Sequence, residues 1–66
     1  MQLVHIADAL REYAAAKDDV KYHRGELVRI AVELGMSQDE AIKTDLVAFL
    51  DGYLFGQGMK QSWRKE

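Results

Sequence analysis

The stretch SQDEAIKTDLVAFLDGYLFG, residues 37–56, contains the clearest helix signals in the chain. Ser37 is followed three residues later by Glu40, and this spacing is a capping box, in which two side chains satisfy free backbone donors at a helix start. Gly56 stands where a left-handed glycine ends many helices. Together these residues predict one capped C-terminal helix from about residue 38 to residue 55.

An apolar face supports the same helix, because its members recur at the spacing of a 3.6-residue period. They are Ile42, Leu46, Phe49, Leu50 and Tyr53. The whole chain has no proline and is 48% hydrophobic, a composition that favours uninterrupted helices. The sequence therefore predicts an all-α fold. Four aromatic residues at helical spacing from other apolar groups are expected in the core or at its rim: Tyr13, Tyr22, Tyr53 and Phe55.

Upstream of this helix, ten positions alternate by three and four residues, the spacing of a heptad seam. They are Leu3, Ile6, Leu10, Tyr13, Lys17, Val20, Arg24, Leu27, Ala31 and Leu34. One continuous helix through them would be about 48 Å long at 1.5 Å per residue. Such a helical hairpin would need a second copy of the chain to cover it.

A break in this long N-terminal helical region is the alternative, and it gives a three-helix bundle. Asp18 or Asp19 is suited to cap a second helix that reaches Leu34. Gly25 is a third place for a break, ranked lower because no residue there caps a new helix and an interior glycine costs only about 1 kcal/mol. The continuous helix and the aspartate break are ranked equally.

The length of 66 residues leaves room for one hydrophobic core, and the chain has no cysteine for disulfides or thiolate metal sites. We expect one helical domain over residues 1–56 and a flexible basic tail, residues 57–66, that carries Trp63. Five apolar residues lie beside the main stripes, so a monomer is expected to expose some of them: Val4, Val28, Val32, Val47 and Leu54. This surplus favours a homodimer, with self-association through Leu3, Ile6, Leu10, Tyr13, Val20 and Leu27.

Two groups of residues have the helical spacing of possible metal ligands: His5 with Asp8 and Glu12, and His23 with Glu26. The spacing is common, and the Glu-x-x-His arrangement of carboxylate-bridged metal sites in bundles is missing. The sequence also contains no glycine-rich phosphate loop and no nucleophile motif. We therefore expect no enzyme activity, no metal and no cofactor.

The stretch around Ala31 and Gly35 resembles a helix-turn-helix, whose first helix carries an alanine four residues before the glycine of the turn. The resemblance implies DNA binding through the helix that follows Ser37. That helix presents Asp39, Glu40 and Asp45, and carboxylates oppose the main source of DNA affinity. A plain turn between packed helices is favoured.

The net charge of −2 is unevenly spread, since an acidic C-terminal helix precedes the basic tail. The predicted function is a small protein-binding module that modulates or inhibits a partner by occupying its surface, as viral or mobile-element inhibitors of nucleic-acid-handling machines do. The residues expected to contact the partner are Asp39, Glu40, Asp45, Asp51, Trp63 and Arg64. The alternatives are a DNA-binding regulator and a self-assembling structural or adaptor protein. We expect a cytoplasmic location and no membrane span, because no apolar run approaches about 18 residues.

Overall fold

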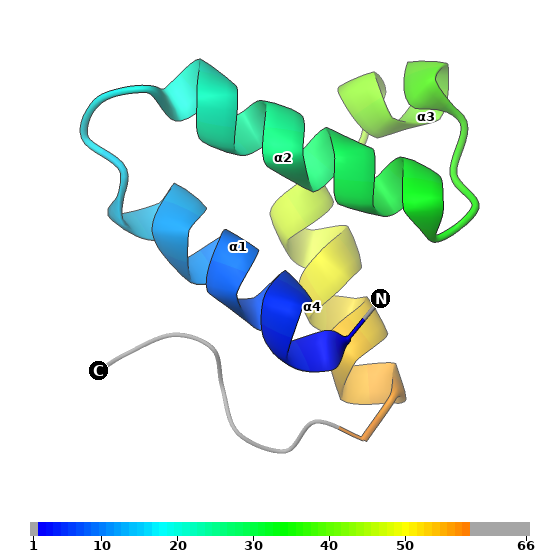
Figure 1. Ribbon diagram of the computed structural model, residues 1–66. Coiled ribbons are helices and arrows are strands. Elements are labelled where there is room, and N and C mark those ends of the chain that lie inside the picture. Colours follow the sequence, from blue (N-terminus) through cyan, green and yellow to red (C-terminus); the bar gives the residue numbers. More distant parts are fainter. Residues whose placement is uncertain (1, 59–66) are drawn as a thin grey trace.

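The computed structural model describes residues 2–58 of the chain. Within them the chain forms four helices and no strand: α1 (Leu3–Ala15), α2 (Val20–Glu33), α3 (Gln38–Lys43) and α4 (Leu46–Gly56). Figure 1 shows α1 and α2 joined by a short loop; α4 packs against both of them, and α3 packs mainly against α2. The predicted all-α fold is confirmed. The predicted helical hairpin and the predicted three-helix bundle both have fewer helices than the four in the described residues.

The long N-terminal region is broken where the aspartates predict it. α1 ends at Ala15, and α2 begins after Asp19, whose backbone is left-handed with a φ of 57°. Aspartate tolerates this conformation better than most residues, although its side chain makes no capping hydrogen bond here. The continuous helix is wrong, and Gly25 lies inside α2. Folding back at residues 16–19 lets α1 and α2 bury their apolar stripes against each other.

The turn after α2 is a Schellman motif. The amide of Met36 donates to the carbonyl of Ala31 at 3.0 Å, and the amide of Gly35 donates to that of Val32 at 3.0 Å. Both bonds satisfy carbonyls that the end of α2 leaves free. They require a positive φ at Gly35, which has a φ of 111°. The predicted turn at this glycine is confirmed.

A matched pair of glycine substitutions tests this turn. Gly35→Ala is expected to lower the free energy of unfolding by about 1–2 kcal/mol, because a Cβ disfavours the left-handed region. Gly25→Ala is expected to raise it by about 0.5–1 kcal/mol, since Gly25 lies inside α2 with no atom within 4 Å of an added Cβ. Urea unfolding followed by circular dichroism measures both free energies. Effects of the same sign would contradict the assignment of Gly35 to a left-handed turn and of Gly25 to a helix interior.

The predicted single helix from residue 38 to residue 55 is wrong. Ser37 caps α3 as expected, since its Oγ accepts from the amide of Glu40 at 3.2 Å, but the helix stops after Lys43. Thr44 and Asp45 are extended, with ψ angles of 147° and 94°, and the Asp45 carboxylate accepts from the amide of Ala48 at 3.3 Å to begin α4. The predicted C-cap is also displaced, because Gly58 rather than Gly56 has a positive φ.

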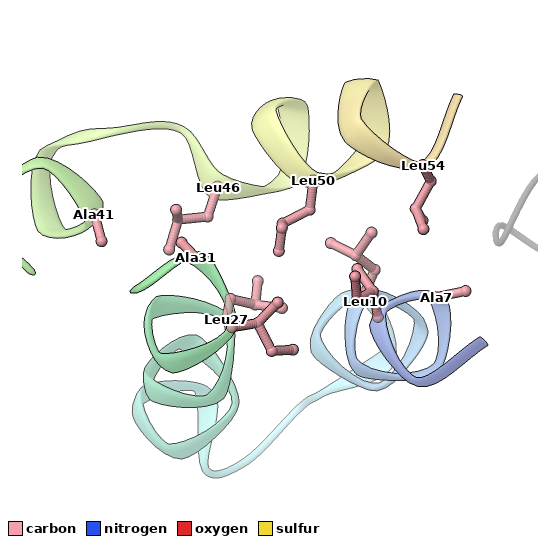
Figure 2. Packing of buried hydrophobic residues seen from close by; sticks show 10 residues of the cluster. Ala7, Leu10, Leu27, Ala31, Ala41, Leu46, Leu50 and Leu54 are labelled. Atoms are coloured by element: carbon pink, nitrogen blue, oxygen red, sulfur yellow. The ribbon is translucent and has the colours of Figure 1, made fainter. Parts of the chain in front are cut away.

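Burial explains the break. α4 contributes Leu46, Leu50 and Leu54 to the core, where all three are buried. Figure 2 shows these side chains directed toward α1 and α2, so α4 covers the apolar face of the α1–α2 pair. A straight helix from α3 would carry them away from it. The core comprises Ile6, Ala7, Leu10, Leu27, Ile30, Ala31, Ala41, Leu46, Leu50 and Leu54.

The short helix α3 is attached to α2 by one apolar and one polar contact region. Ala41 is fully buried and small enough for a close approach of the two helices. The guanidinium of Arg24 donates to the backbone carbonyl of Ile42 at 2.9 Å. This carbonyl belongs to the last turn of α3, where helical partners run out. Arg24, which interrupts the predicted apolar seam with a positive charge, therefore connects α2 to α3 through a hydrogen bond.

Candidate protein-binding surfaces

The core leaves several large apolar side chains on the surface. Among the described residues these are Val4, Val20, Tyr22, Val32, Ile42 and Phe55. Of the five residues beside the predicted stripes, Val4 and Val32 are exposed, Val28 and Val47 are half-buried, and Leu54 is buried. Tyr22 and Phe55 depart from the core or rim position that the sequence predicts. Large aromatic side chains in such positions are typical anchors of protein interfaces.

Phe55 is the most exposed of these residues, with 79% of its surface accessible. It lies in the last turn of α4, next to Leu54, which is buried against the core. The helix therefore directs two consecutive apolar side chains in different directions, one inward and one toward solvent. Nothing in the stability of the single chain requires an exposed phenylalanine, so Phe55 is a candidate contact for another molecule.

The acidic residues expected to contact a partner do not lie along one helix face. Asp39 and Glu40 are exposed in the first turn of α3, while Asp51 is exposed on α4. Asp45 lies between the two helices and is engaged as the cap of α4. The break at residues 44–45 divides the predicted acidic face, and only Asp39 and Glu40, the α3 carboxylates, are adjacent on one short helix. Trp63 and Arg64 lie outside the described residues.

A groove runs between α1 and α2, with a volume of about 190 Å³. We call it the hairpin groove; its lining residues are His5, Asp8, Ala9, Glu12, Tyr22, His23 and Glu26. The structure thus brings together the two groups that the sequence singles out by their helical spacing. Because α1 and α2 are antiparallel neighbours, residues near the end of one helix meet residues near the start of the other.

Arginines next to the hairpin groove offset part of its negative charge. Arg11 contacts Asp8 at 2.7 Å, and Arg29 contacts Glu26 at 2.7 Å. The hydrogen bond from Arg29 to Glu26 and the charge of that carboxylate raise the pKa of the Arg29 guanidinium. Over residues 2–58, no three histidine, cysteine or acidic side chains are placed to hold a metal ion. The groove is a polar concave surface with an exposed tyrosine at its edge.

The residues predicted for self-association have mixed positions. Ile6, Leu10 and Leu27 are buried in the core of a single chain. Leu3 and Tyr13 are half-buried against that core, and Val20 is exposed at the start of α2. A seam that joins two folded copies through all six residues would need the core to open. Self-association through them stays a prediction.

The segment from α2 through the turn to α3 has the local form of a helix-turn-helix. Ala31 is fully buried, and Gly35 supplies the left-handed turn. The second helix, however, is only six residues long and begins with the α3 carboxylates. Its exposed surface carries two carboxylates against one cation, Lys43, whereas most DNA-binding helices present mainly positive charge to phosphates.

No helix in the described part of the chain is both long and apolar enough to cross a membrane. Comparison of the chain with protein-family models, curated proteins and solved structures gives no match.

Proposed function

We propose that the chain is a protein-binding module that modulates or inhibits a partner protein by covering part of its surface. The observation that carries this proposal is the exposure of Phe55, an aromatic side chain left in solvent although ten other apolar residues between positions 2 and 58 are buried. Aromatic residues dominate the energetics of many interfaces, because they remove a large apolar area from water and lose little conformational entropy.

Charge supports a basic partner surface. The α3 carboxylates are exposed in the first turn of α3, and Ala41 of the same helix is buried. Exposed carboxylates speed the encounter with a positively charged surface and select against acidic ones. Such surfaces are common on proteins that bind nucleic acids, so the module would compete with nucleic acid for its partner.

Charge reversal on α3 tests the proposal. A bait with Asp39→Lys and Glu40→Lys is expected to capture about tenfold less partner protein than the unaltered chain from nuclease-treated lysate of the native host. Captured protein is quantified by mass spectrometry at several salt concentrations, and the difference is expected to shrink as salt rises. Asp45 is left unchanged because it caps α4.

A control bait carries the same change in charge elsewhere, with Glu12→Lys in the hairpin groove and Asp18→Lys in the α1–α2 loop. It is expected to capture the partner nearly as well as the unaltered chain. Equal losses with both baits would indicate a general effect of charge, and a loss with the control alone would move the interface to the groove. Capture that is insensitive to both changes would refute a charged interface.

DNA binding is the second candidate, favoured by the helix-turn-helix form of residues 20–43. It makes the opposite prediction for the same variant. If α3 enters DNA, removal of its two carboxylates strengthens binding, because each added lysine contacts phosphates. A gel-shift titration with the unaltered chain and the α3 variant distinguishes the two functions.

A further inference from the structure

The α3–α4 corner consists of only two residues with extended backbone. Helical bonding continues as far as the amide of Thr44, which donates to the carbonyl of Glu40 at 2.9 Å, and resumes where the amide of Phe49 donates to that of Asp45 at 3.0 Å. In the described structure, the amides of residues 45–48 have no backbone acceptor. Rotation of the chain at Thr44 and Asp45 into helical angles would supply all four of these bonds.

The sequence on both sides of the corner is suited to one continuous helix. No proline or glycine occurs from residue 37 to residue 51. Ile42 is 52% exposed in the bent chain, although it falls in register with Leu46 and Leu50. In a straight helix Ile42 would extend the same apolar stripe. The local sequence therefore favours a straight helix, and the bend exists because α4 returns to the core of its own chain.

We propose that two copies of the chain exchange α4, with α3 and α4 of each copy joined into one helix across the corner. In the exchanged dimer, α4 of one copy lies on the α1–α2 pair of the other. The inference does not rest on the binding of a partner protein. It gives the self-association of this chain a structural route that leaves Ile6, Leu10 and Leu27 in the core.

The exchange preserves the contacts that matter most to the fold. Leu46, Leu50 and Leu54 are buried in both arrangements, because the second copy offers the same α1–α2 surface. Only the corner changes, and a short connection whose sequence favours a straight helix promotes exchange. A straight single chain is excluded, since it would leave all three leucines in water.

Besides the burial of α4, two polar contacts stabilise the corner of the bent form. The Asp45 carboxylate caps α4 through the amide of Ala48, and Arg24 donates to the carbonyl of Ile42. Both act on groups that a continuous helix would pair within itself. By contrast, the Thr44 hydroxyl, which donates to the carbonyl of Glu40 at 2.6 Å, is compatible with either form. Substitution of Asp45 is therefore the most specific way to shift the equilibrium between the bent and the straight form of the corner.

Two substitutions at Asp45 form a matched test, because both remove the cap. Asp45→Ala allows a continuous helix and is expected to strengthen dimerisation about tenfold, as measured by sedimentation equilibrium. Asp45→Pro fits the bent chain, since the φ of Asp45 is −72° and the amide of Asp45 has no backbone acceptor there. Proline blocks the straight helix, so this variant is expected to remain monomeric at every concentration. Equal association constants for the two variants would overturn the proposal.

A complementation experiment separates exchange from contact between two intact surfaces. Leu10→Asp damages the α1–α2 pair and leaves α4 intact, whereas Leu50→Asp damages α4 alone. Each chain is expected to lose most of its helix signal when studied by itself. Mixed in equal amounts, they are expected to form a heterodimer with one complete core and to regain helical ellipticity. A mixture whose ellipticity equals the average of the two chains would refute the exchange.

Discussion

Replacement of Leu50 by alanine is expected to lower the free energy of unfolding by about 3 kcal/mol. Leu50 is fully buried near the middle of α4, and Figure 2 shows it pointing toward the space between α1 and α2. The substitution removes apolar contact with both helices and leaves a cavity that three short helices close only in part. Domains of this size have a small total stability, so this single loss brings the chain close to unfolding.

Urea unfolding at low protein concentration measures the change, so that self-association does not add to stability. Val4→Ala is the matched control, because it also truncates an aliphatic side chain on a helix, at a position that is 63% exposed. It is expected to change the free energy of unfolding by less than about 0.5 kcal/mol. Similar losses for the two variants would mean that α4 does not cover the core in solution.

Local signals predicted the features that depend on a few neighbouring residues. The Ser37 cap, the Gly35 turn and the break near Asp19 all involve backbone conformations that particular side chains favour or permit. Each of them is present in the structure. The choice between a broken and an unbroken N-terminal region stayed open, because Lys17 and Arg24 weakened the apolar seam without ending it.

The break at residues 44–45 was not predictable from local pattern, because the pattern favours the opposite result. Ile42, Leu46 and Leu50 have the spacing of one helix face, and no residue between them disrupts a helix. The bend is a tertiary effect, since α4 gains more from burial against α1 and α2 than the chain loses in four helical bonds. A weak sequence signal was present in Asp45, a preferred capping residue followed by an apolar run.

The surfaces were predictable only in part, because they too depend on how the helices pack against one another. The spacing of His5 and Glu12 placed them on one face of α1, but their approach to His23 depends on how α1 and α2 pair. The exposure of Phe55 depends on which side of α4 meets the core. Its neighbour Leu54 lies beside the predicted stripe and is nevertheless buried, which turns Phe55 toward solvent.

Replacement of Phe55 by alanine is expected to weaken partner binding by about 30-fold, equivalent to about 2 kcal/mol, if this ring is an interface anchor. The ring is largely in water in the free chain, so the substitution is expected to change the free energy of unfolding by less than about 0.5 kcal/mol. Loss of binding without loss of stability distinguishes an interface residue from a core residue. The apparent dissociation constant follows from the partner captured at increasing bait concentrations.

Tyr22→Ala provides the matched control, because Tyr22 is an aromatic residue that is 65% exposed on a different helix, at the edge of the hairpin groove. Full binding by this variant together with weak binding by Phe55→Ala would place the interface at the end of α4. The reverse result would place it at the groove. If neither substitution weakens capture, exposed aromatic anchors do not hold the partner, and the proposed function loses the observation on which it depends.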